Sequence, residues 1–214
     1  MTRAFEDVTV VTEGVELPGL LARPEGAVGI VIFAHGSGSS RLSTRNQAVA
    51  RWLVERDCAT LLFDLLTPTE AGDRRNVFDI PLLGQRVVAT TRWWQRRSEA
   101  EGMPIGCFGA STGAAAALVA ASELGDEIAA VVSRGGRPDL AIPVLPTVVS
   151  PTLLIVGSHD DVVVDLNRKA QAHLQCENRL AIVEGATHLF EEPGTLEQAA
   201  AHAGDWFVQH FAPA

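Results

Sequence analysis

Short, continuous apolar runs alternate with longer amphipathic stretches along most of this chain. Residues 29–34, for example, are apolar throughout and lack the polar alternation of a half-exposed strand. Such a run is typical of a strand that is buried on both faces of a parallel sheet. Strands that are separated by helices also imply right-handed crossover connections. The pattern therefore predicts an α/β domain in which helices flank a mostly parallel sheet.

The order of the runs predicts about eight strands and five main helices. The strands are expected at residues 8–11, 17–22, 29–34, 59–63, 105–108, 128–132, 152–156 and 180–183. The helices are expected at residues 44–56, 82–97, 112–124, 166–174 and 196–211. Ligands of such sheets bind beyond the carboxyl ends of the strands. The loops that follow the strands are therefore where functional residues should lie.

Local signals mark some of the ends of these elements. Glu13 and Gly14 separate the first two strands, which predicts a hairpin. Gly125 is expected to end the helix at 112–124, because glycine is common just after a helix. Thr195 and Gln198 have the spacing of a capping box, which predicts the start of the last helix.

Composition narrows the class of protein. The chain has 214 residues, 47% of them hydrophobic, which suits a single domain over residues 1–214. A formal net charge of -9 argues against nucleic-acid binding, which needs a basic surface. The chain has neither a secretory signal pattern nor a run near the roughly 20 apolar residues that cross a bilayer. We expect a soluble, cytoplasmic protein with a small-molecule substrate, no membrane partner and no cofactor.

The pentapeptide Gly109-Ala110-Ser111-Thr112-Gly113 lies between the fifth predicted strand and an alanine-rich helix pattern. This context, more than the GxSxG pattern alone, is typical of a nucleophile elbow, where a strained turn exposes the serine. The two glycines allow strand and helix to approach closely. The sequence therefore predicts Ser111 as a catalytic nucleophile. The alternative is a glycine-rich turn in which the serine only caps the helix.

A nucleophilic serine needs a base that accepts its proton and a carboxylate that orients the base. After an elbow of this kind, the acid precedes the histidine along the chain. His188 follows the last predicted strand directly, whereas three other histidines fall inside helix patterns: His173, His202 and His210. Asp160 and Asp161 both follow the strand at 152–156. His188 is therefore the predicted base, and either aspartate could be the acid.

Acyl transfer also needs donors for the oxyanion of the tetrahedral intermediate, each of which contributes about 2.7–4 kcal/mol. One expected donor is the backbone N–H of Thr112, directly after the nucleophile. The other should come from the loop after the third strand, and Ser37 is the candidate. His35, in the same loop, is interpreted as a structural hydrogen-bonding residue. The histidines and aspartates of these loops do not have the spacing of a metal site.

With these motifs the chain resembles the α/β-hydrolase superfamily, and within it the small, lidless branch that is grouped with the dienelactone hydrolases. The resemblance covers nearly the whole chain and is carried by four segments: His35-Gly36-Ser37-Gly38, Gly109-Ala110-Ser111-Thr112-Gly113, Gly157-Ser158-His159-Asp160 and Gly185-Ala186-Thr187-His188. It implies a serine hydrolase that cleaves small carboxylic esters.

The resemblance also implies individual roles. In this family the acid stands three residues after the glycine that ends its strand, which favours Asp160 over Asp161. Dienelactone hydrolases proper use a cysteine nucleophile and a glutamate in the oxyanion loop, whereas this chain has Ser111 and a glycine–serine loop. The family name therefore serves here as a label for the fold. Relatives of this kind also occur beside or fused to phosphoribosyltransferase domains.

Residues 134–151 lie between the sixth and seventh predicted strands and are rich in proline and β-branched types. They should not form a helical lid, so the site should be open and shallow and should take small soluble esters. Within this segment, Arg134 or Arg137 is predicted to bind a substrate carboxylate. The alternative is that one arginine is solvated and the other pairs with Asp139. A thioesterase, a peptidase, a perhydrolase or a non-catalytic interaction module remain open as other functions.

Overall fold

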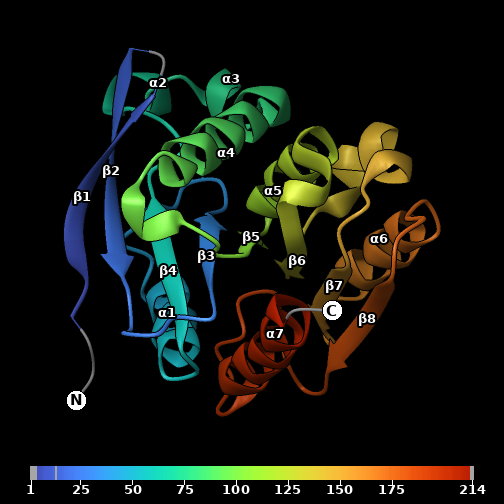
Figure 1. Ribbon diagram of the computed structural model, residues 1–214. Helices are drawn as coiled ribbons and strands as arrows, with labels where there is room; N and C mark the ends of the chain where they lie inside the picture. Colours follow the sequence, from blue (N-terminus) through green and yellow to red (C-terminus); the bar gives the residue numbers. More distant parts are fainter. Residues whose placement is uncertain (1–3, 13, 213–214) are drawn as a thin grey trace.

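The apolar runs that were predicted as strands form one eight-stranded sheet in the computed structural model, which describes residues 4–12 and 14–212. Its order is β1-β2-β4-β3-β5-β6-β7-β8 (Figure 1). The strands are β1 (Glu6–Thr12), β2 (Val15–Ala22), β3 (Gly29–Ala34), β4 (Cys58–Phe63), β5 (Ile105–Ala110), β6 (Ile128–Arg134), β7 (Thr152–Gly157) and β8 (Asn178–Val183).

Strands β3 to β8 are parallel to one another, as predicted. Strand β2 pairs antiparallel with both β1 and β4, and Thr12 lies opposite Val15 in the register of the expected hairpin. The turn residue of this hairpin, Glu13, lies outside the described residues. The parallel strands therefore direct their carboxyl ends to one edge of the sheet.

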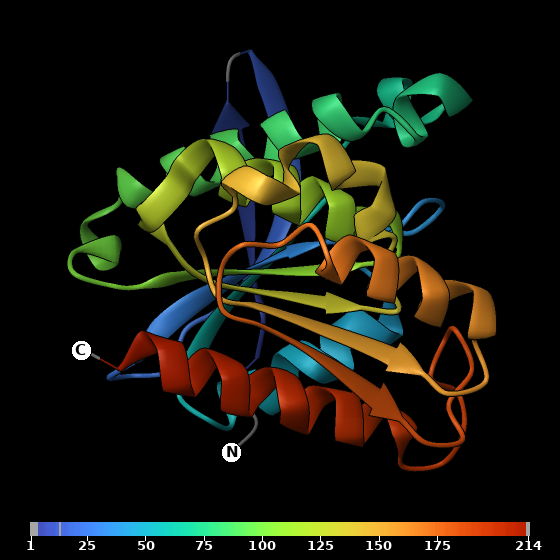
Figure 2. The same ribbon diagram turned by 90° about the vertical axis from the view of Figure 1, so that its right-hand side faces the viewer.

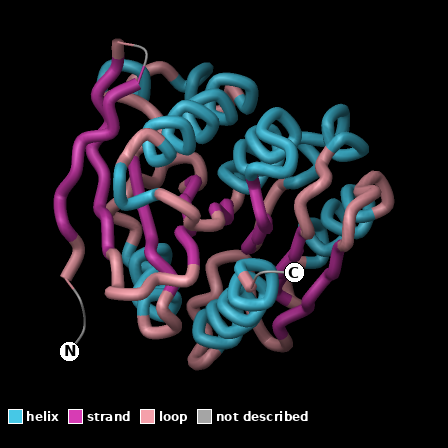
Figure 3. The backbone as a smooth tube through the Cα atoms, in the orientation of Figure 1, coloured by secondary structure: helices cyan, strands magenta, loops and turns pink. Residues whose placement is uncertain are grey.

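Helices cover both faces of the sheet (Figures 2 and 3). Five are long: α1 (Thr44–Val54), α4 (Ile80–Gln95), α5 (Thr112–Leu124), α6 (Asp161–Gln171) and α7 (Thr195–Phe211). Short helices are α2 (Pro68–Ala71), α3 (Arg74–Val77) and three 3₁₀ segments, η1 (Ser98–Ala100), η2 (Gly125–Glu127) and η3 (Pro138–Thr147). Helices α1 and α7 pack on one face, and α4, α5, α6 and η3 pack on the other.

The central strands have no polar face because both of their faces are covered. In β3, Ile30 and Ile32 belong to the apolar cluster on the α4–α5 face, whereas Val31 and Phe33 belong to the cluster on the α1–α7 face. All six residues of β3 are buried. Burying each large side chain of this kind contributes about 1.5–3 kcal/mol. The continuous apolar runs are thus explained by two separate cores.

Three predicted helix starts were wrong. Helix α4 begins at Ile80 instead of residue 82. Helix α6 begins at Asp161 instead of residue 166, because the β-branched Val163 and Val164 have a buried face against β7 that outweighs their weak helix propensity. The capping box is not formed, because Gly194, with φ of 81°, is the N-cap of α7. The Thr195 hydroxyl instead donates a hydrogen bond to the Glu192 carbonyl at 2.8 Å.

The segment after β6, which was not expected to form a helical lid, is helical and packs on one face of the sheet. It forms η3, which packs against α5 and α6. The short helices α2 and α3, between β4 and α4, were not predicted. Pro68, Ala71 and Val77 of these helices line a cavity together with residues of the loop after β3. Gly125 ends α5 as predicted, with φ of 60°. Among the described residues, no helix combines the length and the hydropathy that crossing a membrane requires.

Candidate active site

Ser111 lies at the junction of β5 and α5 and has φ of 52° and ψ of -124°. A left-handed conformation of a non-glycine residue costs on the order of 1–3 kcal/mol, so the surrounding structure must hold it. The Ser111 N–H donates to the Arg134 carbonyl at 3.3 Å, and the Ser111 carbonyl accepts from Arg137 N–H at 3.0 Å. The strained turn that the GxSxG pattern predicts is therefore present.

Small residues allow this turn to close. A Cβ atom at Gly109 would lie 2.3 Å from the Ala114 Cα, and one at Gly113 would lie 2.1 Å from the Ala34 carbonyl oxygen. Both distances fall far inside van der Waals contact with backbone atoms that cannot move aside. The turn therefore depends on glycine at both positions, and it directs the Ser111 side chain to the edge where the strands end.

The loops after β7 and β8 bring an acid and a histidine together at the same edge. His188 Nδ1 donates a hydrogen bond to Asp160 Oδ2 at 2.6 Å. Asp160 is the N-cap residue of α6, but its side chain makes no capping hydrogen bond and is free to contact the imidazole. Asp161 is exposed in the first turn of α6. Of the two aspartates that the residues left open, Asp160 is the one that reaches His188.

Backbone contacts hold these two loops against each other. His159 N–H donates to the Ala186 carbonyl at 2.9 Å, and Gly185 N–H donates to Ser158 Oγ at 2.8 Å. A Cβ atom at Gly157 would lie 2.3 Å from the Ala186 carbonyl oxygen, so the loops touch directly. The position of Asp160 relative to His188 is therefore set by main-chain packing as well as by their own hydrogen bond.

Ser111 and His188 line the same pocket, which has a volume of about 240 Å³. Within residues 4–12 and 14–212, Ser111 Oγ makes no hydrogen bond to His188. Catalytic hydrogen bonds are often loose before substrate binds and tighten in the complex. The three predicted triad residues thus lie at one edge of the sheet. Ser111 and His188 line one pocket, and Asp160 contacts His188 from behind it.

The two expected oxyanion donors lie side by side. The Ser37 N–H donates to the Thr112 hydroxyl at 2.9 Å, which ties the loop after β3 to the first residue of α5. This role of the Thr112 side chain was not predicted, because the residues suggested only its backbone N–H. Gly36 packs against the nucleophile, since a Cβ atom there would lie 2.9 Å from the Ser111 Cβ. The loop is therefore held close to Ser111.

His35 anchors the base of this loop. Its Nδ1 donates to the Gly36 carbonyl at 2.9 Å, and its Nε2 accepts from the Leu65 N–H at 3.1 Å. These partners assign the neutral tautomer with the proton on Nδ1. Burial lowers the pKa of His35, which favours this uncharged form. The contacts fit the structural role that was expected for this residue.

The two candidate arginines have different surroundings. Arg137 forms two hydrogen bonds of 2.8 Å with Asp139. This is the pairing that the alternative to substrate binding predicted for one of the two arginines. Arg134 is not solvated: only 7% of its surface is exposed, and it lines the pocket of Ser111. Its Nη2 donates to Asn46 Oδ1 at 3.2 Å. The structure thus brings Arg134, and not Arg137, to the pocket.

Arg134 also lacks an acidic partner among the described residues, and its Nε and Nη1 atoms are buried without a hydrogen bond. The Phe190 ring covers its guanidinium at 5.6 Å. Burial, and then the nearby charge of Arg45, lower the pKa of Arg134 to about 10. Arg45 lines the same pocket and pairs with Glu191 at 3.2 Å. The sequence pattern of α1 contained no signal that distinguished Arg45 or Asn46 from other residues of a helix.

No group of three or more histidine, cysteine, aspartate or glutamate side chains among the described residues is arranged to hold a metal ion. The site brings together a strained serine, a histidine with an oriented ring, the backbone N–H groups of Ser37 and Thr112, and a buried arginine. Such a set suits attack on an acyl carbon and stabilisation of the negative charge that follows.

Comparison with known proteins identifies the family of this fold. Residues 17–213 match the model of the dienelactone hydrolase family. The crystal structure of a dienelactone hydrolase from Anabaena variabilis is 48% identical, with a TM-score of 0.95 over 98% of this chain and 99% of that one. An esterase from Pyrococcus furiosus shares the fold at 18% identity, with a TM-score of 0.76 over 99% of this chain and 92% of that one.

A longer relative was also found in Mycobacterium tuberculosis H37Rv, where it carries the provisional name of a phosphoribosyl transferase. It is 57% identical over 205 residues, which cover 96% of this chain and 46% of that protein. The chain therefore spans about half the length of this curated relative. The family model and the identities to these proteins lead to one conclusion: this α/β hydrolase belongs to the dienelactone hydrolase family.

Proposed function

We propose that this protein is a serine hydrolase that cleaves small carboxylic esters through an acyl-enzyme intermediate. The observation that carries the proposal is the shared pocket of Ser111 and His188, with the 2.6 Å contact of His188 to Asp160 behind it. Neither a binding module nor a scaffold needs a serine in a strained conformation beside an oriented histidine. The esterases among the structural relatives support the choice of ester substrates.

In the proposed mechanism, Ser111 Oγ attacks the ester carbonyl while His188 Nε2 accepts its proton. The Thr112 and Ser37 N–H groups receive the oxyanion, and for this the Ser37 N–H turns away from the Thr112 hydroxyl or is shared with it. His188 then gives the proton to the leaving alcohol, and water releases the acid by the same route. Asp160 keeps the proton of the resting imidazole on Nδ1.

Replacing the nucleophile tests the proposal directly. Ser111→Ala should lower kcat by about 10⁴- to 10⁶-fold with the fold intact, because covalent catalysis is lost. The activity should be measured on p-nitrophenyl esters, with thioesters and amides in parallel to identify the acyl bond that is cleaved. A fluorophosphonate adduct located by mass spectrometry should lie on Ser111. Labelling of another residue, or undiminished turnover by the variant, would exclude this mechanism.

The phosphoribosyl transferase name belongs to proteins about twice as long as this chain. We propose that the ester-cleaving site belongs to the segment that these proteins share with this chain. Phosphoribosyl transfer is then a property of the part that lies outside the match. This division is supported by the family match, which runs from residue 17 to residue 213 and includes all three proposed triad residues.

We further propose that Arg134 binds an anionic group of the substrate. A buried cation without an acidic partner is unfavourable, and a ligand carboxylate could accept two parallel hydrogen bonds from its guanidinium. Arg134→Met should raise KM by about tenfold for esters that carry a carboxylate. It should change KM little for neutral esters. The fold should tolerate the change, because apolar replacement of buried ions is often neutral or stabilising.

The matched control is Arg137→Met, which removes a cation that is already paired with Asp139 and does not line the pocket. Initial rates over a range of concentrations of paired acidic and neutral esters would separate KM from kcat. If Arg134→Met affects both classes of ester equally, Arg134 only supports the pocket, and its assignment to substrate binding fails.

A further inference from the structure

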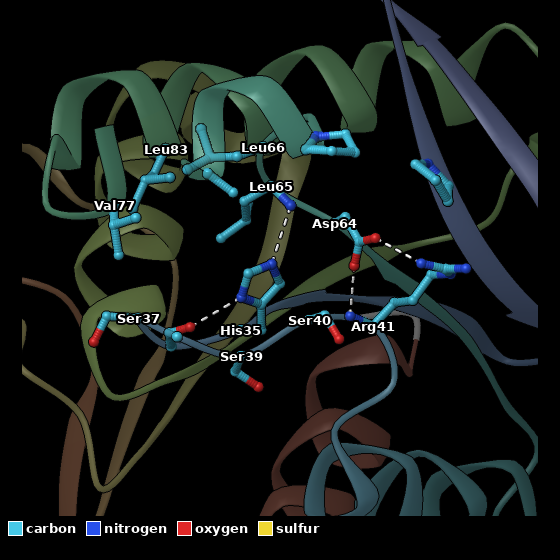
Figure 4. Close-up of a pocket in the computed structure, with 15 residues that line it drawn as sticks. His35, Ser37, Ser39, Ser40, Arg41, Asp64, Leu65, Leu66, Val77 and Leu83 are labelled. Carbon is cyan, nitrogen blue, oxygen red and sulfur yellow. Dashed lines mark hydrogen bonds and ion pairs between the residues drawn. The ribbon is translucent and has the colours of Figure 1, made fainter. Parts of the chain in front are cut away.

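A second cavity, of about 300 Å³, lies on the other side of the loop that carries Ser37 (Figure 4). The figure shows the side chains of Leu65, Leu66, Val77 and Leu83 on one side of this cavity and His35 and Ser37 on the other. The aliphatic wall comes from the segment directly after β4, from α3 and from α4. The unpredicted helices α2 and α3 therefore form part of a recess beside the proposed oxyanion loop.

The cavity has an aliphatic wall and little net charge. Its two charged residues neutralise each other, because Arg41 Nη1 pairs with Asp64 Oδ2 at 2.6 Å. Both ring nitrogens of His35 are occupied by backbone partners. Leu65 and Leu83 are 1% and 3% exposed, so both are packed into the apolar core beneath the cavity. A recess of this kind favours an apolar occupant and contrasts with the pocket of Arg134.

The cavity is adjacent to the nucleophile. Gly36 and Ser37 line both this cavity and the pocket of Ser111. Gly36 also packs against the Ser111 side chain. A group that is attached to the carbonyl carbon under attack could therefore extend along the loop and enter the cavity within the length of a short chain.

The order of the strands decides whether the acyl half or the alcohol half of an ester would enter the cavity. The cavity lies at β3 and β4, whereas Asp160 and His188 follow β7 and β8, on the opposite side of β5. The alcohol oxygen must face His188, because the imidazole gives it a proton. The acyl half, whose carbonyl oxygen points to the oxyanion donors, then extends to the other side of Ser111. That side is the side of the cavity.

We propose that this cavity binds the acyl group of the substrate and that the preferred esters have a medium-length apolar acyl group. The inference rests on the proposed ester hydrolysis and adds the class of acid to it. A cavity of about 150 Å³ lined by aliphatic and aromatic side chains holds one benzene ring. A volume of about 300 Å³ is therefore suited to a larger group, such as an alkyl chain of six to eight carbons or a phenylalkyl group.

The test compares two series of esters. In one series the acyl group varies, from p-nitrophenyl acetate to p-nitrophenyl octanoate. In the other the acyl group is always acetyl, and the alcohol varies from phenol to 4-butylphenol. Each methylene that leaves water favours binding by about fourfold. Even with partial burial, kcat/KM for p-nitrophenyl octanoate should therefore exceed that for p-nitrophenyl acetate by at least tenfold. In the series of acetate esters, kcat/KM should depend little on the size of the alcohol.

Val77→Trp should fill the cavity and lower the octanoate-to-acetate ratio of kcat/KM by at least tenfold. Val77 is a half-buried residue of α3 that lines the cavity, so the larger ring can be accommodated without disturbing the sheet. The matched control is Val208→Trp, on the exposed surface of α7 on the other face, which should leave the ratio unchanged. If circular dichroism shows that Val77→Trp is unfolded, Leu66→Trp is the second variant, because Leu66 lines the same cavity.

Labelling separates the two proposals. If a fluorophosphonate modifies Ser111 in each variant but the acyl-length preference is absent, or is unchanged by filling the cavity, the acyl assignment is wrong and the serine mechanism stands. If Ser111 is not labelled at all, the proposed hydrolysis itself fails.

A change confined to the acetate series would assign the cavity to the alcohol half and would also overturn the inference. A crystal structure with an octylphosphonate adduct should place the alkyl chain against Leu65 and Val77.

Discussion

At the scale of single residues, Asp160 and Asp161 differ by one position in the chain and have different environments. Asp160 contacts His188 at 2.6 Å, whereas Asp161 is exposed at the start of α6. The difference arises because the backbone at Asp160 is not yet helical, with φ of -110° and ψ of 60°. Its side chain can therefore point to the loop after β8, while the next residue already follows the helix.

This difference predicts the ranking of two conservative variants. Asp160→Asn should lower kcat by up to roughly 10⁴-fold with little change in KM, because the amide favours the wrong tautomer of His188. Asp161→Asn is the matched control and should retain most of the activity. Steady-state kinetics on one p-nitrophenyl ester would compare them. If Asp161→Asn is the more damaging of the two, Asp160 is not the acid.

His35 predicts a pH dependence of stability. Burial lowers its pKa in the folded protein below the usual value of about 6.5, so the unfolded chain binds the proton more readily. The free energy of unfolding should therefore fall as the pH decreases below about 6.5. Urea unfolding at pH 7.5 and pH 5.5 should show a smaller decrease for His35→Gln, which cannot titrate. Equal decreases in the variant and the wild type would mean that His35 does not contribute to this acid sensitivity.

At the scale of elements, the strand–turn–helix unit of β5 and α5 shows how small side chains determine a functional geometry. Helix α5 is largely alanine on its buried side, which lets it lie close to the sheet, and its first residue, Thr112, accepts a hydrogen bond from the Ser37 N–H. The helix amino end also contributes positive potential near Ser111. The unit therefore positions the serine, one proposed oxyanion donor and a favourable field at the same time.

A single methyl group should disturb this unit. Gly113→Ala would place a Cβ atom 2.1 Å from the Ala34 carbonyl oxygen, which is backbone and cannot rotate away. We expect a loss of at least about 1–3 kcal/mol in the free energy of unfolding, typical of overpacking, together with reduced activity. Gly72→Ala is the control, because Gly72 is exposed with φ of -67° and should change stability by less than about 1 kcal/mol. Denaturant unfolding of both variants measures the difference.

At the scale of the whole molecule, the loop after β3 separates two recesses of opposite character. The pocket of Arg134 lies toward α1 and contains cationic and polar groups, whereas the second cavity lies toward α4 and has an aliphatic wall. The formal net charge of -9 gives the molecule an unfavourable long-range field for anions. A buried arginine at the site counters this field locally. The arrangement suits an ester with an apolar acyl half and an anionic group near the leaving alcohol.

Much of this molecule could be predicted from its residues, because the relevant interactions are local or periodic. The continuous apolar run of β3 indicated a strand with two covered faces, and Gly109 and Gly113 indicated a close strand–helix turn. The three proposed triad residues could be named because parallel strands place the loops that follow them at one edge. Strands, helices and tight turns could therefore be predicted, because their residue patterns are local or repeat along the chain.

The tertiary structure alone decided the features that depend on contacts between distant segments. It placed Arg134 in the pocket because Asn46 and Phe190, from two other parts of the chain, surround its guanidinium. It also decided that the helices after β4, rather than the segment after β6, form the wall of a cavity. The sequence determined which residues end the strands, and packing between segments determined which of them share a pocket, because partners far apart in the chain leave no periodic signal.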